Sequence, residues 1–352
     1  MSPDSGFWRD RRVLLTGHTG FKGAWAAIWL HRLGARVTGL ALQPDTEPSL
    51  WNAAGAGLVH ESIIGDIRDP AIVGEAVARA KPSVVLHMAA QPLVRRSYAE
   101  PVDTFATNVM GTIHLLEALR SSEGLEAVLI VTTDKVYSNA EQGRDFIEDD
   151  PLGGHDPYSA SKAAAEIAAA SYRTSFFEPI RIPVATARAG NVIGGGDWSA
   201  DRLIPDVWRA ASQGESVALR NPDSTRPWQH VLEPLAGYFL YLEALGSRRP
   251  VPSALNFGPP AGASASVAHV AEMMAEALGS QTAWRRDEGP APPEMKLLSL
   301  DPRRAIDSLG WRPLLSCEEA IEWSASWYAQ HDRGADPLRL CRAQLDAYEA
   351  LA

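Results

Sequence analysis

The stretch VLLTGHTGFKGAWAAIWLHRL, residues 13–33, decides the fold. A short apolar run (13–16) leads into the glycine-containing loop GHTGFKG, and a longer segment of helical length (21–33) follows. This order predicts a buried strand, a tight turn and a helix, which together form the first unit of an open α/β sheet.

The same alternation continues through the first half of the chain. Short β-branched runs separated by longer helical patterns predict βαβ units, and therefore a parallel sheet covered on both faces. We expect strands over 35–42, 62–64, 83–90, 127–133 and 184–191, and helices over 69–80, 98–120 and 157–177. The predicted fold class is doubly wound α/β.

The character of the chain changes after residue 190. The segments IGGGDWSADRLIPD, NPDSTRPW and NFGPPAGAS are rich in Pro and Gly, which interrupts regular elements. We expect a Rossmann domain over 1–189, to which a segment near 229–256 returns. Residues 190–352 are expected to form a smaller, mixed α/β substrate domain. Ligands of such sheets bind at the carboxyl ends of the strands, so the cleft between the two parts should hold the site.

Composition excludes several classes of protein. The apolar content of 45% and charged content of 22% are those of a globular chain, not a disordered or fibrous one. A net charge of −10 provides no general attraction for nucleic acid or anionic lipid. We expect no membrane span, no cleavable signal and no metal site. The two cysteines, without metal-like spacing, favour a reducing cytoplasm.

The glycine loop is typical of a dinucleotide site. Gly17, Gly20 and Gly23 follow GxxGxxG spacing, which permits a tight turn and close approach of the backbone to a pyrophosphate. The helix that follows points its amide groups at the phosphates. His18 and Lys22, inside the loop, are candidates to hold those phosphates. The acid expected about 20 residues later is missing, so the sequence leaves NAD versus NADP open.

A second motif indicates proton chemistry. Tyr158 and Lys162, in YSASK, are spaced to lie on one face of a helix. A lysine ammonium beside a phenol lowers the pKa of the phenol, which makes it a base near neutrality. Thr133, at the end of the preceding strand, is placed to bond the substrate oxygen.

In these motifs the sequence resembles the extended short-chain dehydrogenase/reductase family, from residue 13 to about 313. The resemblance implies a Rossmann domain with bound NAD and a C-terminal domain for a nucleotide sugar. It also implies cofactor contacts from Gly17, His18, Gly20, Phe21, Lys22, Gly23, Asp66, Ile67, Ala89, Ala90 and Gln91. The motifs that fall in family order are GHTGFKG, GDIRD, HMAAQ, TTDKVY, YSASK, RAGNVIGGGDW and LDPRRAIDSLGWRP.

Within this family the pair Asp134–Lys135 is informative. The sugar-nucleotide 4,6-dehydratases add an acid and a base to the Thr–Tyr–Lys set because they must also expel water. Asp-Lys at this position resembles the CDP-glucose branch and also the inverting dehydratases of UDP-N-acetylglucosamine. The segment TRPWQHVLEPLAGY (225–238) resembles the CDP-glucose branch more closely than it resembles the UDP-N-acetylglucosamine dehydratases.

The resemblance also implies a substrate site. Arg226 and Asn191 match positions that contact the diphosphate, Arg303 matches a further nucleotide contact, and Arg202 is expected beside them. An arginine fork suits phosphate oxygens.

The implied reaction is loss of water from CDP-glucose through internal hydride transfer. Tyr158 would remove the carbon 4 hydroxyl proton, Lys135 the carbon 5 proton, and Asp134 would protonate the leaving hydroxyl. Alternatives are a dehydratase of a UDP- or dTDP-linked sugar, a nucleotide-sugar 4-epimerase, or a non-catalytic NAD-binding protein. The helices over 98–120 and 157–177 carry apolar residues on more than one face, and the family resemblance implies that they pair across a dimer interface, so we expect a homodimer or a dimer of dimers.

Overall fold

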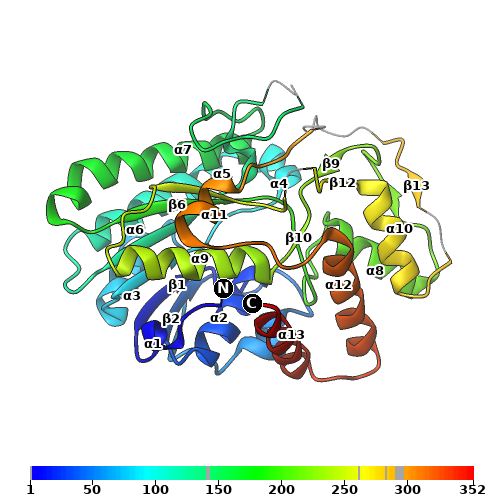
Figure 1. The fold of residues 1–352 in the computed structure, drawn as a ribbon, viewed down its shortest axis with the longest axis horizontal. Coiled ribbons are helices and arrows are strands. Elements are labelled where there is room, and N and C mark those ends of the chain that lie inside the picture. Colours follow the sequence, from blue (N-terminus) through cyan, green and yellow to red (C-terminus); the bar gives the residue numbers. More distant parts are fainter. Residues whose placement is uncertain (1, 140–142, 261, 282–283, 290–296) are drawn as a thin grey trace.

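The computed structural model describes residues 2–139, 143–260, 262–281, 284–289 and 297–352. Its centre is a seven-stranded parallel sheet in the order β11-β6-β5-β4-β1-β2-β3 (Figure 1). The strand order reverses between β1 and β4, which makes this the switch point where ligands of such sheets bind. The predicted doubly wound α/β fold is confirmed. The strands are β1 (Arg12–Thr16), β2 (Arg36–Ala41), β3 (Glu61–Ile64), β4 (Val84–His87), β5 (Ala127–Val131), β6 (Val184–Ala189) and β11 (Ala254–Phe257).

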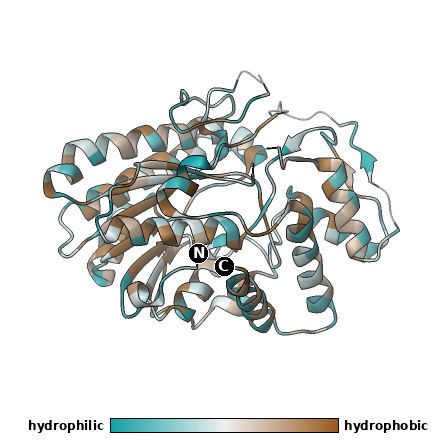
Figure 2. Ribbon diagram, in the orientation of Figure 1, coloured by the Kyte–Doolittle hydropathy of each residue, from teal (hydrophilic) through white to brown (hydrophobic). Residues whose placement is uncertain are grey.

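Helices cover both faces of the sheet because its strands are apolar on both faces. Side chains alternate along a strand, so Val13 and Leu15 pack into one apolar cluster while Leu14 packs into another. Hydrophobic residues accordingly dominate the central strands in Figure 2. The first cluster includes α2 (Phe21–Arg32) and α9 (Leu232–Gly246), and the second includes α3 (Pro70–Ala80), α6 (Gly111–Leu119) and α7 (Pro157–Tyr172).

The helix expected over 98–120 is not continuous. The short helix α4 (Val94–Ala99) ends at Glu100, and α5 (Pro101–Phe105) begins anew. Pro101 disfavours a helical conformation in the residue before it, and Glu100 has φ −128° and ψ 59°. One π-helical turn, η2 (Ala106–Met110), then joins α5 to α6. The second long helix also ends in a π-turn, η4 (Arg173–Phe177).

Besides α9, two segments after residue 190 pack against the sheet and its helices. The strand β11 pairs with β6 and forms one edge of the sheet. The last helix, α13 (Pro337–Leu351), lies beside α2, where Glu349 accepts a hydrogen bond from Trp29 Nε1 at 2.9 Å. Further elements near the carboxyl edge of the sheet are η3 (Asp134–Val136), β7 (Val192–Ile193), α8 (Leu203–Gln213), β8 (Ala218–Leu219), β9 (Thr225–Arg226) and β10 (Gln229–His230). The remaining elements are α1 (Ser5–Trp8), η1 (Trp51–Gly55), η5 (Glu178–Ile180), β12 (Ala265–Ser266), α10 (Val267–Ala277), β13 (Arg285–Arg286), α11 (Arg303–Leu309) and α12 (Cys317–Asp332).

Within the described ranges, none of the helices has the length and apolar character that a membrane crossing needs. Cys317 and Cys341 are buried free thiols.

Candidate active site

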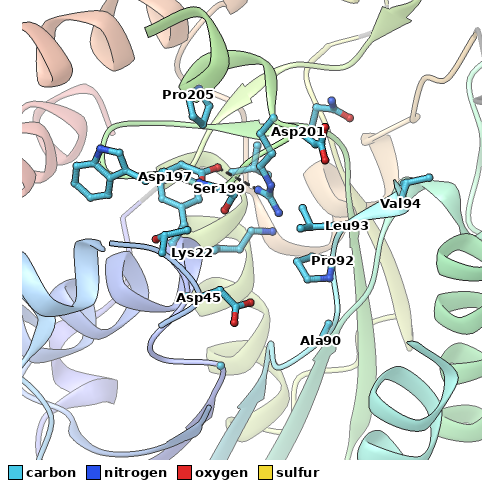
Figure 3. Close-up of a pocket in the computed structure, with 18 of the residues that line it drawn as sticks. Lys22, Asp45, Ala90, Pro92, Leu93, Val94, Asp197, Ser199, Asp201 and Pro205 are labelled. Atoms are coloured by element: carbon cyan, nitrogen blue, oxygen red, sulfur yellow. Dashed lines mark hydrogen bonds and ion pairs between the residues drawn. The ribbon is translucent and has the colours of Figure 1, made fainter. Parts of the chain in front are cut away.

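A cavity of about 520 Å³ opens at the carboxyl ends of β1, β4, β5 and β6 and extends under the segments after residue 190. It gathers most of the residues that the sequence motifs singled out. Figure 3 shows part of its wall, with Lys22 reaching inward between Asp45 and the loop of Asp197 and Ser199. The predicted residues that line it are Gly17, Gly20, Phe21, Lys22, Gly23, Asp66, Ile67, Ala89, Ala90, Thr133, Lys135, Tyr158, Lys162, Asn191, Arg202 and Arg226.

The glycine loop has the shape of a phosphate cradle. Gly17 has φ +78°, and a Cβ there would lie 2.8 Å from the backbone nitrogen of Ala89. A Cβ on Gly23 would lie 2.0 Å from the carbonyl oxygen of Gly17, so only glycine lets helix α2 approach the loop. Gly20 is the N-cap of α2 and provides no side-chain cap, which leaves the first amides of the helix available to a phosphate. These features fit a bound dinucleotide.

His18 does not point into the cavity, although it lies in the same loop. Its ring is buried, with Nε2 2.8 Å from Ser62 Oγ and an edge-on contact with Trp51. Gly39 leaves room for the ring, because a Cβ there would lie 2.4 Å from His18 Cγ. Burial lowers the pKa of His18 to about 4, so the ring is neutral and supplies no charge for a phosphate. The expected phosphate contact from this side chain is therefore not seen.

Lys22, in contrast, extends into the cavity. Its Nζ lies 5.6 Å from the centre of the Tyr238 ring. Burial and the positive charges of Arg202 and Lys162 lower the pKa of Lys22 to about 7, and Asp134 opposes this shift. Several cations thus converge on one space, which is an arrangement suited to an anionic ligand.

Tyr158 and Lys162 lie at the start of α7. Asp156 caps this helix by accepting from the backbone nitrogen of Ser159 at 2.9 Å, and Pro157 occupies the first helical position. The Nζ of Lys162 donates to the carbonyl oxygen of Val131, at the end of β5, at 2.8 Å. The helix start therefore holds both side chains against the carboxyl edge of the sheet.

The expected activation of the phenol is not present in this state of the protein. Burial raises the pKa of Tyr158 to about 12, and a hydrogen bond with Thr133 opposes the increase. Burial lowers the pKa of Lys162 to about 8, and the charge of Glu166 opposes that change. The prediction that Lys162 lowers the pKa of Tyr158 overlooked burial, which disfavours both charged forms.

Asp134 and Lys135 form the 3₁₀ turn η3 directly after β5. The Asp134 side chain is fully buried, and its Oδ1 accepts from Thr133 Oγ1 at 2.9 Å and from Lys135 Nζ at 3.4 Å. Its Oδ2 has no hydrogen-bond partner among the described residues. A Cβ on Gly190 would lie 3.2 Å from that oxygen. Asp134 is thus placed just beneath the cavity floor, and Lys135 reaches the cavity itself.

The positions predicted to bind substrate divide into two groups. Arg226, on β9, is buried and donates to the carbonyl oxygen of Thr225 at 2.8 Å, and Arg202 pairs with Asp197 at 3.3 Å. Both line the cavity, as does Asn191. Arg303 lies elsewhere on α11, with a side chain that is 80% exposed and paired with Asp301. Its place in the family motif therefore did not identify a residue that lines the cavity.

Two further outcomes concern single residues. Asp66 lines the cavity and is paired with Arg68 at 2.6 Å. Gln91 is turned into the protein, where its Nε2 donates to Leu93 O and Thr104 Oγ1, so it supports the loop and does not line the cavity.

Arg220 lines the cavity but was not predicted from the sequence. It lies in RNPDS, a charged and Pro-containing loop of the kind that often carries binding residues.

No cluster of three or more metal-ligating side chains occurs in the part of the chain that the structure describes.

The parallel sheet with its glycine loop, and the Tyr–Lys pair at the sheet's carboxyl edge, define an extended short-chain dehydrogenase/reductase. Residues 14–323 match the family described as GDP-mannose 4,6 dehydratase, and the chain belongs to this family. It is 43% identical to a CDP-glucose 4,6-dehydratase of Salmonella typhimurium, over 98% of each chain. It is 27% identical to a dTDP-glucose 4,6-dehydratase of Xanthomonas campestris, over 90% of this chain and 92% of that one.

Solved structures of similar fold include both dehydratases and epimerases. A dTDP-glucose 4,6-dehydratase of Bacillus anthracis in complex with NAD superposes with a TM-score of 0.76 at 21% identity, over 93% of this chain and 99% of that one. A UDP-glucose 4-epimerase of Thermus thermophilus in complex with NAD superposes with a TM-score of 0.77 at 27% identity, over 92% and 99%. The fold alone therefore does not separate the two reactions.

Proposed function

We propose that this protein is an NAD-dependent CDP-glucose 4,6-dehydratase, which converts CDP-D-glucose to CDP-4-keto-6-deoxy-D-glucose and water. The observation that carries the proposal is the placement of Asp134 and Lys135. Lys135 lines the cavity together with Thr133, Tyr158 and Lys162, and the buried Asp134 beneath it accepts hydrogen bonds from Thr133 and Lys135. The 43% identity to a CDP-glucose 4,6-dehydratase supports the choice of nucleotide.

The glycine loop and the start of α2 are the proposed binding site for the pyrophosphate of NAD. Asp66 and Ile67 line the same cavity at the end of the sheet beyond β2, where the adenosine half would lie. When bound, NAD accepts the hydride from carbon 4 of the sugar and returns it to carbon 6, so no external oxidant is consumed.

The first proton transfer falls to Tyr158. Its phenolate takes the proton of the carbon 4 hydroxyl as that carbon becomes a ketone. Thr133 holds the oxygen, and Lys162 supplies a positive charge on the same helix face. Because the phenol has a pKa of about 12 in the free protein, the reaction needs further positive charge in the cavity, which oxidised cofactor carries.

Elimination of water falls to the pair on η3. A neutral Lys135 removes the proton on carbon 5, which the new ketone makes acidic, and a protonated Asp134 donates to the departing carbon 6 hydroxyl. The neutral pair has the same net charge as the ion pair, and Lys135 Nζ lies 3.4 Å from Asp134 Oδ1, so passing one proton from Lys135 to Asp134 supplies the base and the acid without changing the net charge of the cavity. Lys135 then returns its proton to carbon 5.

Thr133 completes the proton balance. Tyr158 has gained one proton and Asp134 has lost one, and the Thr133 hydroxyl hydrogen-bonds both side chains. A shift of protons through this hydroxyl restores the phenolate and the carboxylic acid. The water released therefore contains the carbon 6 hydroxyl and one proton that came from carbon 4 oxygen by way of the protein.

The cations of the cavity are the proposed site of the substrate diphosphate. Arg226 and Arg202 come from the segments after residue 190, and Asn191, two residues after the end of β6, lines the same cavity. We assign the boundary between the cofactor and substrate domains to residues 189 and 190 on this basis.

The proposed assembly is a homodimer or a dimer of dimers. Exposed apolar side chains gather on the outer helices of one face of the sheet: Val102, Phe105, Met110, Ile167 and Phe176. Replacing Ile167, which is 61% exposed, by Glu should give monomers in light scattering. A wild-type protein that is itself monomeric would contradict this assembly. The buried free thiols support a reducing, cytoplasmic setting.

The test is a panel of CDP-, UDP- and dTDP-glucose, each incubated with the NAD-loaded enzyme and followed by mass spectrometry. We expect CDP-glucose to lose one water and to become a keto sugar. A product of unchanged mass would indicate a 4-epimerase. Turnover of a UDP or dTDP sugar without turnover of CDP-glucose would overturn the choice of nucleotide.

A further inference from the structure

A buried ion pair joins α7, the helix that carries Tyr158 and Lys162, to strand β6, and the proposed reaction makes no use of it. Glu166 on α7 and Arg188 on β6 are each 4% exposed. The arginine binds the carboxylate with two parallel bonds of 3.0 Å, from Nε to Oε1 and from Nη2 to Oε2. Burying two charges is expensive unless every remaining polar atom is satisfied. The other hydrogen bonds of the pair therefore indicate what it holds.

Glu166 holds the start of the catalytic turn. Its Oε1 accepts from Thr132 Oγ1 at 2.5 Å, and its Oε2 accepts from Thr186 Oγ1 at 2.7 Å. Thr132 is the first residue after β5 and immediately precedes Thr133. The hydrogen bond from Thr132 to Glu166 thus fixes the N-terminal end of the turn relative to α7.

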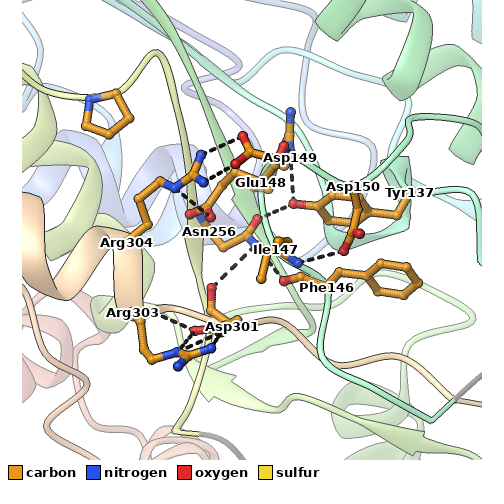
Figure 4. A network of polar contacts seen from close by, with 12 residues as sticks. Tyr137, Phe146, Ile147, Glu148, Asp149, Asp150, Asn256, Asp301, Arg303 and Arg304 are labelled. Carbon is orange, nitrogen blue, oxygen red and sulfur yellow. Dashed lines mark hydrogen bonds and ion pairs between the residues drawn. The ribbon is translucent and has the colours of Figure 1, made fainter.

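Arg188 holds the other end of the turn. Its Nη1 donates to the hydroxyl of Tyr137 at 2.9 Å and to the carbonyl oxygen of Glu148 at 3.0 Å. The Tyr137 hydroxyl donates in turn to Asn256 Oδ1 at 2.6 Å, on β11 (Figure 4). The Tyr137 ring also stacks on Phe146, with the ring centres 4.8 Å apart. Tyr137 is the residue that follows η3.

We propose that Glu166 and Arg188 are positioning residues that clamp both ends of the segment 133–136 onto the helix carrying Tyr158 and Lys162. Residues 158, 162 and 166 follow one another at spacings of four, so they share one face of α7. A single rigid pair thus sets the distance between the group that deprotonates the carbon 4 hydroxyl and the groups that remove water. The inference rests on the proposed function, because it assigns those two tasks to the two segments.

The pair also places a negative charge behind Lys162. Burial lowers the pKa of Lys162 to about 8, and Glu166 opposes this. Burial would raise the pKa of Glu166, but Arg188 and the two threonine hydroxyls hold it below its ordinary value. The charge of Lys162 also acts on Lys22 of α2 and His87 of β4, Tyr158 precedes it by four residues on α7, and Arg188 of β6 is paired with Glu166. Glu166 is thus the counter-charge that favours the ammonium form.

The mildest test is Tyr137→Phe, which keeps the stacked ring and removes only the hydroxyl. We expect kcat to fall by about 10- to 100-fold, because small misplacements of reacting groups have effects of this size, and KM to change by less than about twofold. Bound cofactor should accumulate in its reduced form, since Tyr158 is untouched while elimination slows. A lower melting temperature with wild-type kcat and no reduced cofactor would show a merely structural role and overturn the proposal.

A second test separates the clamp from the stability of the fold. Glu166→Gln leaves the Arg188 charge buried and unpaired, so it can also impair folding. The double variant Glu166→Gln/Arg188→Met removes both charges and should fold, yet we expect its kcat to stay reduced by at least about tenfold. In Glu166→Gln, activity should be lost with rising pH earlier than in the wild type, because Lys162 releases its proton more easily. Wild-type kcat and pH profile in the double variant would contradict the clamp.

The matched control is Glu233→Gln. Glu233 is also a fully buried carboxylate with all its bonds satisfied, by the backbone nitrogens of Leu314 and Leu315 and by the Tyr348 hydroxyl. It lies on a different network and should keep the wild-type kcat and pH profile.

A readout without substrate distinguishes failure of this inference from failure of the proposed function. The amine of Lys162 can be titrated by NMR of protein carrying carbon-13-labelled lysines, with its signal assigned by its loss in a Lys162→Met partner of each protein. Loss of Glu166 should move this titration to lower pH, because the negative charge that favours the ammonium form is removed. A wild-type enzyme inactive on every nucleotide sugar overturns the proposed function alone. An unmoved titration in Glu166→Gln overturns the role of Glu166 as the counter-charge.

Discussion

Replacing Asp134 by Asn tests the assignment of the acid. The amide has nearly the volume of the carboxyl group, and its oxygen can still accept from Thr133 Oγ1, which now lies 2.9 Å from Asp134 Oδ1. The amide cannot release a proton to the departing carbon 6 hydroxyl. The oxidation at carbon 4, which depends on Tyr158, should still occur.

The size of the effect follows from the lost proton transfer. General acid catalysis contributes about 10²–10⁴-fold, which corresponds to about 3–5 kcal/mol in the barrier of the elimination step. No large separate loss of stability is expected, because Asp134 Oδ2 already has no hydrogen-bond partner among the described residues and an amide nitrogen at that position would be equally unsatisfied.

The assay is stopped-flow mixing with CDP-glucose, recording the near-ultraviolet absorbance of reduced nicotinamide and the keto-sugar product. We expect the variant to reduce its bound cofactor and then to stall, with turnover lowered by the factor above. The control is Asp149→Asn, which breaks the ion pair with Arg304 away from the cavity at an Asp149 side chain that is 71% exposed, and it should leave turnover unchanged. Turnover of Asp134→Asn within about threefold of the wild type would contradict the assignment.

Three other variants test separate parts of the structure. Lys135→Arg keeps the positive charge, but arginine cannot give up its proton. We expect kcat to fall by about 100-fold or more and exchange of the carbon 5 hydrogen with deuterated solvent to stop. Continued exchange would exclude Lys135 as the base. Gly23→Ala would place a Cβ 2.0 Å from Gly17 O, so calorimetric NAD affinity should fall at least about tenfold, and unchanged affinity would show that α2 can move away. Burial raises the pKa of Glu233 from 4.5 to about 7, so the folded state keeps a proton that the unfolded chain releases in this range. The resulting stabilisation is complete below pH 4.5 and is lost as pH rises towards 7. In urea unfolding, the free energy of the wild type relative to Glu233→Gln should therefore fall by about 3 kcal/mol over that range, and a difference independent of pH would contradict the raised pKa.

The sheet and its first helices could be predicted because their signals are local. The apolar run 13–16 and the spacing of Gly17, Gly20 and Gly23 specify a strand, a turn and a close-packed helix without reference to the rest of the chain. The break at Glu100 also had a local signal, since Pro101 follows it, but the apolar pattern across 98–120 concealed it. The π-turns had no signal of this kind.

Cavity residues could be predicted where the motif fixes the backbone. They were harder to predict where the direction of a long side chain depends on packing against distant parts of the chain. Lys22 and His18 lie in the same loop, yet Lys22 enters the cavity and His18 turns beneath it towards Ser62. That choice depends on the space above Gly39, on a strand remote from the loop in sequence. Arg303 similarly binds its near neighbour Asp301 and stays in solvent.

The clamp of Glu166 and Arg188 could not be found from sequence. Its partners Thr132, Tyr137 and Asn256 are brought together only by the pairing of β5, β6 and β11. The pKa of Tyr158 depends in the same way on burial, which the YSASK spacing does not report.

The most direct measurement uses CDP-glucose with deuterium at carbon 4. Internal hydride transfer followed by loss of water predicts a keto sugar that is lighter by one water and retains the deuterium, now at carbon 6. A product of unchanged mass, or one in which the hydrogen at carbon 6 comes from solvent, would contradict a 4,6-dehydratase built on Tyr158, Asp134 and Lys135.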